Sequence, residues 1–274
     1  MTPRSFGPTQ AYPCCFTLCI AALACSSPAA QRAEPAAPVS SSAAAPAGEG
    51  APPAAGAPPA PEPCPAAEPA AALAWTADAG ATLGAALPLR LGDPKVEQSP
   101  HGAALCFDGV DDGLAFEHNP LAGMGRFTVQ VLFRPDAIGT PEAPSEQRFV
   151  HFEEGATTTP DSRRALIETR VVGDQWFLDT FLRAAGGNKA LIDPQKKHPV
   201  GHWYWVALSY GDGTMRHYID GELELEGAVP FEPLCPGRTS LGVRLNRVSW
   251  FKGCLRELRV TPSVLSAGEL AKMR

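Results

Sequence analysis

The feature that most limits how this chain can fold is a run of 47 residues, 26–72, which contains no aromatic residue and no Leu or Ile. Thirty-one of these residues are Ala or Pro. Such a segment cannot bury enough apolar surface to offset the conformational entropy that it would lose on ordering. We therefore expect an extended linker, which at about 3.1 Å per residue can reach on the order of 100 Å.

Residues 1–24 have the pattern of an export signal. Arg4 precedes the uncharged stretch 14–24 (CCFTLCIAALA), which is too short to span a bilayer, because a span takes about 20 residues. Cys25 follows directly on small residues, an order that resembles the lipobox of bacterial lipoproteins, although a lipobox usually carries Leu at the place of Ala22. The pattern predicts cleavage after residue 24 and lipidation of Cys25. Ordinary signal cleavage at the same bond would instead give a soluble secreted protein.

The rest of the chain has the composition of one folded domain. All five Trp and all six His lie beyond residue 72. About 200 residues suit a single large all-β domain. We therefore predict a signal peptide at 1–24, a lipidated cysteine and disordered tether at 25–72, and one domain at 73–274.

The charge of this domain argues against a nucleic-acid partner. From residue 73 onward, 21 Lys and Arg stand against 25 Asp and Glu, a net charge of −4 with both signs interspersed. Binding to phosphates needs a clustered basic face. The densest basic group is the short run 196–198 (KKH), which we interpret as a solvated loop.

The cysteines support export. Three of the eight leave with the signal and Cys25 would be acylated, so four remain: Cys64, Cys106, Cys235 and Cys254. An even number in an exported chain is typical of disulfides. No C-x-x-C pair occurs, so a zinc site of the finger or ribbon kind is not supported.

Short strands separated by tight turns are predicted beyond residue 72. Four segments alternate β-branched, aromatic and polar residues: 127–133, 176–181, 203–210 and 215–220. Asp-Gly pairs, which accept the positive φ angles of hairpin turns, stand at 108–109, 112–113, 212–213 and 220–221. The sequence therefore predicts an antiparallel meander, with a short helix at most near Ser266 and Glu269, which have the spacing of a capping box.

Four sequence blocks also follow one another in a fixed order. They are 106–114 (CFDGVDDGL), 127–135 (FTVQVLFRP), 203–221 (WYWVALSYGDGTMRHYIDG) and 251–270 (FKGCLRELRVTPSVLSAGEL). Together they resemble LamG-like jelly-roll domains. The resemblance implies an all-β, concanavalin A-like sandwich of two antiparallel sheets with about a dozen strands. Lectins, adhesion domains, calcium-dependent binders and some glycosidases share this fold, so the function has to come from a site.

Two kinds of binding site are candidates. Asp108, Asp111 and Asp112 lie close together in a loop and offer the hard oxygen ligands that suit Ca²⁺, although Asp-Gly turns need no metal to explain them. Trp203 and Trp205 could provide aromatic rings for a glycan on the outer side of a sheet. Packing in the core or at a sheet edge is the alternative for both.

A catalytic strand is the third candidate. Glu222, Glu224 and Glu226 resemble the ExDxE strand of laminarinase-type glycosidases, and acids at period two share a face. They follow directly on a turn, however, and Glu224 stands where the motif has Asp. We therefore expect a solvated strand face with Leu223 and Leu225 pointing inward, and no enzyme.

The histidines do not form a recognisable catalytic or metal-binding motif. None has an i, i+2 or HExxH spacing. His217 lies on the strand face that Met215 and Ile219 share, so we expect a core histidine with one satisfied hydrogen bond.

The resemblance also implies one disulfide. Laminin-G domains join a cysteine ahead of the penultimate strand to the cysteine of the F-x-G-C-I strand that closes the sandwich. The segment 251–255 (FKGCL) matches that strand, which implies a Cys235–Cys254 bond; buried free thiols are the alternative. The pairing of Cys64 and Cys106 stays open.

We interpret the chain as a non-enzymatic binding or structural module of a bacterial cell envelope that contacts a surface protein or a surface polymer. Its membrane contact would be the lipid anchor alone. The main alternative is a calcium-dependent, lectin-like carbohydrate-binding module, and glycoside hydrolysis is the weaker one. The motifs require no cofactor, and Ca²⁺ is the one candidate.

Replacement of Cys25 by Ser should move the protein from the membrane fraction to the soluble exported fraction, because the acyl chains that hold it at the bilayer would be lost. Cell fractionation of the wild type and Cys25→Ser measures this. Wild-type protein that is already soluble would contradict lipidation.

Overall fold

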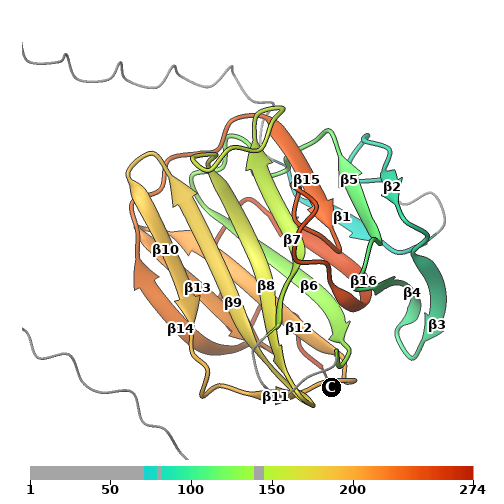
Figure 1. Cartoon of the computed structure of the whole chain (residues 1–274). Coiled ribbons are helices and arrows are strands. Elements are labelled where there is room, and N and C mark those ends of the chain that lie inside the picture. The colour runs from blue at the N-terminus through green and yellow to red at the C-terminus, as the bar shows by residue number, and fades with distance from the viewer. Residues whose placement is uncertain (1–70, 79–81, 139–144, 274) are drawn as a thin grey trace, which may run out of the picture. The chain divides into compact units, whose positions relative to one another are not determined.

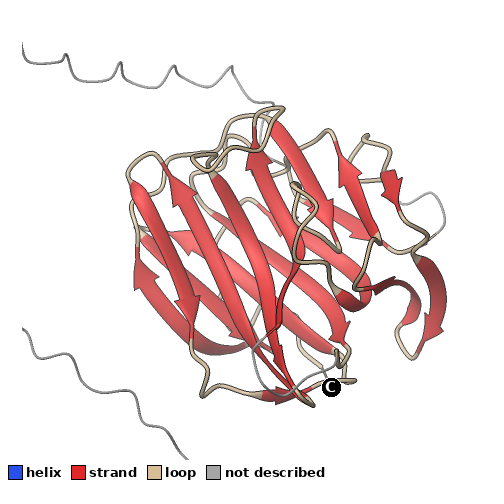
Figure 2. Ribbon diagram, in the orientation of Figure 1, coloured by secondary structure: helices blue, strands red, loops and turns tan. Residues whose placement is uncertain are grey.

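A computed structural model describes residues 71–78, 82–138 and 145–273. Within these ranges the chain forms sixteen strands and no helix, as Figure 2 shows. No helix that is long and apolar enough to cross a membrane occurs in this part of the chain. The predictions for Cys25 and Cys64 lie outside the described residues.

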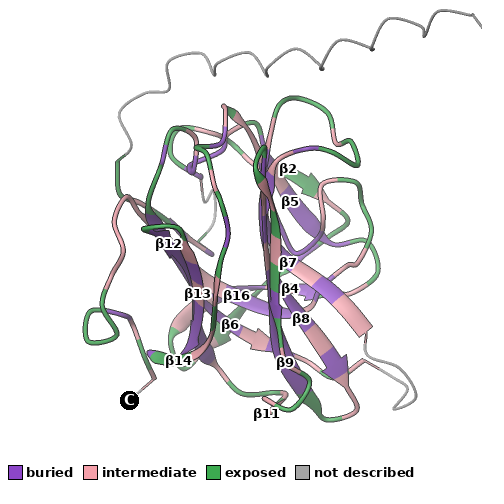
Figure 3. Cartoon of the chain, turned by 90° about the vertical axis from the view of Figure 1, so that its left-hand side faces the viewer, coloured by how far each residue is buried: buried purple, intermediate pink, exposed green. Residues whose placement is uncertain are grey.

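The strands form two antiparallel sheets that face each other, as predicted (Figures 1 and 3). The first sheet has the order β14-β13-β12-β6-β16-β4-β3, and β1 pairs with β16. The bounds of its strands are β1 Leu73–Thr76, β3 Lys95–Ser99, β4 Gly102–Asp108, β6 Phe127–Pro135, β12 Tyr204–Gly211, β13 Thr214–Ile219, β14 Glu222–Ala228 and β16 Lys252–Thr261.

The second sheet has the order β10-β9-β8-β7-β15-β5-β2, and β11 pairs with β9. The bounds of its strands are β2 Leu89–Leu91, β5 Gly113–Phe116, β7 Ser145–Glu154, β8 Arg164–Val172, β9 Gln175–Ala184, β10 Gly187–Ile192, β11 His198–Pro199 and β15 Gly237–Leu241.

Two of the four Asp-Gly pairs form the hairpin turns that the sequence predicts. Asp212 and Gly213 both have positive φ, 52° and 74°, and join β12 to β13. The pair at 220–221, with φ of 48° and 81°, joins β13 to β14 in the same way. Positive φ at both central residues matches the right-handed twist of the flanking strands. These turns fix the register of the β12-β13-β14 meander.

Aromatic side chains hold the two sheets together. The ring of Phe133 from β6 stacks on that of Phe149 from β7, with centroids 4.5 Å apart. Trp176 meets Phe133 edge-on at 5.1 Å, and Phe251 lies 5.4 Å from Phe149. A β-bulge between Arg148 and Val150 accompanies the inward position of Phe149. All four rings are fully buried, so they account for a large part of the apolar area that drives the sheets to pack.

The expected Cys235–Cys254 disulfide is wrong, because Cys254 is bonded to Cys106. These two residues lie directly opposite each other on β16 and β4, with a Cα–Cα distance of 4.0 Å. Cys235 is disulfide-bonded as well, but not to Cys254. It precedes β15, which belongs to the other sheet, so sequence proximity to Cys254 does not bring the two together.

The described part of the chain ends in a single turn rather than a helix. The N–H and the hydroxyl of Ser266 both donate to the Glu269 carboxylate, at 2.8 and 2.7 Å, as the capping-box spacing predicts. The N–H of Leu270 donates to the Ser266 carbonyl, but the chain does not continue as a helix.

The Cys106→Ala/Cys254→Ala double variant should unfold with a free energy about 2–5 kcal/mol lower than that of the wild type, because the bond closes a loop with a sequence separation of 148. Denaturant unfolding without reductant measures the loss. Peptide mapping of the wild type should recover residues 106 and 254 in one cross-linked pair. A peptide pair that joins residues 235 and 254 would contradict the structure.

Candidate functional site

The three predicted calcium ligands lie together, and backbone hydrogen bonds within their loop explain why. The carboxylates of Asp108, Asp111 and Asp112 have oxygens within 4.8 Å of one another. Both oxygens of Asp112 accept N–H groups, from Asp93 at 2.7 Å and from Asp108 at 3.1 Å. Asp108 in turn accepts the N–H of Val110 at 2.8 Å. These bonds shape a tight turn, and calcium at this loop stays a prediction.

The two predicted aromatic ligand residues do not form a bare platform. Trp205 is 8% exposed, and the guanidinium of Arg259 lies 4.6 Å from its ring centroid. Trp203 is half-buried and meets the ring of His101 edge-on at 5.6 Å. Both rings thus pack against neighbouring side chains, and a role for Trp203 and Trp205 in glycan binding stays a prediction.

The C-terminal segment covers part of the outward face of the first sheet. Leu270 and the half-buried Leu265 pack on a small cluster with Ala207 of β12 and Tyr218 of β13. The backbone N–H of Ala271 adds a hydrogen bond to the Gln130 side chain. This face is thus used for internal packing.

A bulge separates the three acids of the predicted catalytic strand. The pairing of β13 with β14 shifts at Glu224, so that this carboxylate bonds His198, with Oε1 2.8 Å from Nε2. Glu226 instead pairs with Arg216 at 2.9 Å. Leu225 packs against the core, but Leu223 is 48% exposed. The expectation of one shared acidic face over two inward leucines is therefore wrong.

The prediction for His217 is confirmed. Its side chain is 1% exposed, and its Nδ1 lies 3.0 Å from the hydroxyl of Thr180 on the facing sheet. Burial lowers the pKa of this histidine from 6.5 to about 3. It is a neutral core residue with one hydrogen-bond partner.

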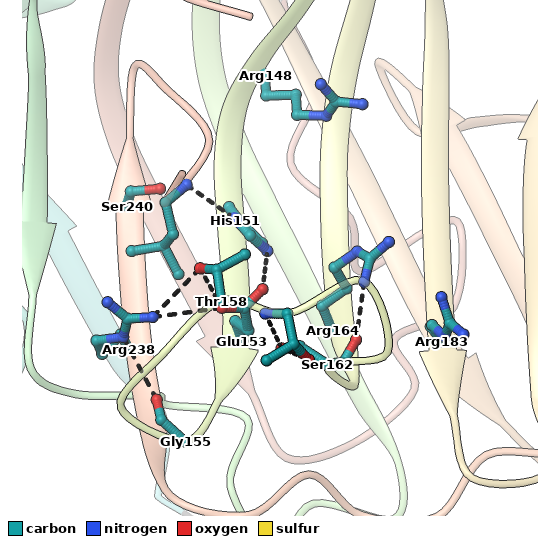
Figure 4. A network of polar contacts seen from close by, with 12 residues as sticks. Arg148, His151, Glu153, Gly155, Thr158, Ser162, Arg164, Arg183, Arg238 and Ser240 are labelled. Carbon is teal, nitrogen blue, oxygen red and sulfur yellow. Dashed lines mark hydrogen bonds and ion pairs between the residues drawn. The ribbon is translucent and has the colours of Figure 1, made fainter. Parts of the chain in front are cut away.

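The sequence analysis missed an extended polar cluster in the described part of the chain. It lies on the outward face of the second sheet, and we call it the arginine face (Figure 4). Strand alternation places its residues opposite the core. Its members are Glu146, Arg148, His151 and Glu153 of β7, Arg164, Glu168 and Arg170 of β8, Asp179 and Arg183 of β9, Arg238 and Ser240 of β15, and Arg244 of the following loop.

Two loops bury this face. The β7–β8 loop folds back over it, since the Thr158 hydroxyl donates to Glu153 at 2.6 Å and Arg183 donates to the Pro160 carbonyl at 2.7 Å. The loop between β15 and β16 covers it from the other side, where the N–H of Leu245 donates to Nδ1 of His151 at 3.1 Å. His151 and Glu153 are consequently fully buried.

Most charges on the arginine face are in ion pairs. Arg148 holds Glu168 at 2.9 Å, and Arg170 holds Asp179 at 2.7 Å. Other pairs are Arg148–Glu146, Arg170–Glu146, Arg183–Asp161 and Arg238–Glu153. Burial raises the pKa of Glu168 to about 7, even though the Arg148 guanidinium acts in the opposite direction. Each ion pair offsets part of the free energy that is lost when its two charges are removed from water.

His151 is a neutral hydrogen-bond donor at the centre of this face. Because its Nδ1 accepts from Leu245, the ring proton is assigned to Nε2. That nitrogen lies 3.4 Å from Oε2 of Glu153, without the alignment of a hydrogen bond. Burial lowers the pKa of His151 to about 4. His151 is therefore a neutral, fully buried ring whose Nε2–H faces the Glu153 carboxylate.

A sequence signal for this face did exist. Arg164, Glu168 and Arg170 alternate with the inward residues of β8, and His151 and Glu153 do so on β7. Alternation shows that they share a side of a strand, but it does not show that loops bury that side.

Solved structures share this fold. The binding domain of botulinum neurotoxin serotype G has a TM-score of 0.52 and 10% identity, and the match covers 72% of this chain and 49% of that chain. The binding domain of Paraclostridial Mosquitocidal Protein 1 has a TM-score of 0.54 and 7% identity, with 72% and 50% covered. That of botulinum neurotoxin DC in complex with SialylT has a TM-score of 0.52 and 10% identity, with 72% and 48% covered.

The chain spans about half the length of these binding domains, and identities this low show a common fold alone. No curated protein sequence matches the chain. The family model of the concanavalin A-like lectin/glucanases superfamily matches residues 108–271, which is more than half of the 274 residues. This chain therefore belongs to the concanavalin A-like lectin/glucanases superfamily.

Proposed function

We propose that the chain is a non-enzymatic binding module which engages a surface glycan or a surface protein through the arginine face of the second sheet. Lipidated Cys25 and the Ala/Pro tether would display the module at a bacterial cell envelope. A superfamily of lectins and glucanases agrees with a binding role. The solved binding domains with this fold add support, and one of them was determined in complex with SialylT.

One observation carries the choice of face. Eleven buried side-chain polar atoms in the described residues have no hydrogen-bond partner, and four of them gather on the arginine face. They are Arg164 Nε, Arg244 Nε, and His151 Nε2 with Glu153 Oε2, which lie 3.4 Å from each other without hydrogen-bond alignment. Buried polar groups without partners are costly, so a cluster of them points to an interaction that a ligand completes.

The other candidate surfaces offer less. The first sheet uses Trp205 for a contact with Arg259 and is partly covered by the C-terminal segment. The acids of β14 are engaged by His198 and Arg216. The arginine face is therefore the region where described polar groups are both concentrated and incompletely paired.

A glycan and polysaccharide array, read with calcium and with chelator, should identify a bound class for the wild type. Arg183→Gln should then weaken binding about tenfold, the usual effect of one lost hydrogen bond to a charged group. The matched control is Arg216→Gln on the first sheet, since Arg183 and Arg216 are 29% and 30% exposed and each has one acidic partner.

Equal binding by Arg183→Gln and Arg216→Gln would contradict the assignment of the arginine face. Binding that depends on calcium and is lost in Asp111→Asn would move the site to the Asp108 loop. Release of sugar fragments by the wild type would show an enzyme. If the wild type bound no glycan on the array but captured a defined surface protein, and Arg183→Gln did not capture it, the partner would be a protein.

A further inference from the structure

Arg164 is the one strand arginine of the arginine face that has no acidic partner among the described residues. Its side chain is only 9% exposed. Its guanidinium donates to two backbone carbonyls, of Ser162 at 2.8 Å and of Pro160 at 3.4 Å, while its Nε has no partner. Its strand neighbours are Glu153 and Arg183, as Figure 4 shows. A positive charge this deeply buried is normally compensated by a carboxylate.

Arg244, which is half-buried, is a second arginine without an ion pair in the described part of the chain. It directly precedes Leu245, whose N–H bonds His151, so it lies beside the centre of the face. Its Nε is buried and has no hydrogen-bond partner. Burial and the charge of Arg148 hold the pKa of Arg244 below its ordinary value, and burial and Arg244 do the same for Arg164. The charge of Arg244 therefore adds to the cost of burying Arg164.

The nearby carboxylates do not neutralise these two cations by direct contact. Glu153 accepts from Thr158 and Arg238 and faces Nε2 of His151. Glu168 is held by Arg148. Two buried donors, the Nε–H groups of Arg164 and Arg244, are thus left without a hydrogen-bond acceptor.

We propose that Arg164 and Arg244 bind one oxyanion of an acidic glycan, either a uronate carboxylate or a sulfate ester. This inference rests on the proposed function and names the ligand class for the same face. Guanidinium groups bind planar carboxylates and sulfates through paired, charge-assisted hydrogen bonds. The bound oxyanion would supply the negative charge that Arg164 and Arg244 lack.

The two arginines differ in how close they lie to solvent. Arg244 is half-buried and residues 246–248 of the same loop are exposed, so the Arg244 side of the pair lies nearer to solvent than Arg164. Arg164 is fixed over the ring of Phe181, with its guanidinium carbon 5.2 Å from the centroid. Sugar rings would remain outside this point, where Phe181 is half-buried and can contact their apolar faces.

Sodium polygalacturonate, dextran sulfate and neutral dextran are the probes, measured by calorimetry with the full chain. We expect the wild type to bind an acidic polymer and not dextran, with affinity that falls as sodium chloride rises. Arg244→Gln and Arg164→Gln should each weaken binding at least tenfold. Arg216→Gln, with the same change in net charge, should bind like the wild type. Arg244 is less buried than Arg164, so its variant serves if Arg164→Gln does not fold.

Each outcome decides the inference. Binding of polygalacturonate alone assigns a carboxylate, and binding of dextran sulfate alone assigns a sulfate ester. The wild type could instead bind a neutral polymer or an acidic peptide. If Arg183→Gln weakened that binding and Arg244→Gln left it unchanged, the inference would be overturned but the proposed function would stand. Absence of binding to every probe, array glycan and surface protein would overturn both.

Discussion

Burial of the second sheet on both of its faces is the constraint on which the rest of the structure depends. One face packs on the first sheet through Phe149 and Trp176. The other carries alternating charged residues, and the loops after β7 and β15 cover it, so His151 and Glu153 are removed from water. Charged side chains can stay there only with partners, because desolvation of an isolated charge costs several kcal/mol.

The need for partners explains why most charged residues of this face form ion pairs, and it makes the unpaired Arg164 an exception. Cross-strand register puts Arg148 beside Glu168, and the pair stays intact although burial raises the pKa of Glu168 to about 7. Arg164 instead has Arg183 and Glu153 as strand neighbours, and Glu153 is already engaged by Arg238. Buried polar groups without partners and charged groups with perturbed pKa values concentrate at functional sites, which is why the arginine face is the candidate.

Local sequence patterns predicted the fold well. They did not predict the site, because the site forms where loops distant in sequence cover one face of a sheet. The alternation in 127–133 and the Asp-Gly pairs at 212–213 and 220–221 encode strands and turns directly, and β6, β12 and β13 confirm them. Cys254 pairs with Cys106 instead of Cys235, because the topology places β4 beside β16. A single bulge between β13 and β14 changes the side of the strand on which Glu224 lies, and no local sequence pattern predicts this bulge. Loop coverage of His151 depends on residues 94 positions away in sequence.

Arginine side-chain NMR, which reads the Nε–H signals, tests the central claim most directly. Titration of the labelled protein with the glycan selected by the array should shift the signals of Arg164 and Arg244 first and furthest, because their Nε–H groups acquire an acceptor. The signal of Arg216, paired with Glu226 on the other sheet, should stay in place. Shifts confined to Arg216 or to the backbone of the Asp108 loop, with Arg164 and Arg244 unchanged at saturation, would contradict binding at the arginine face.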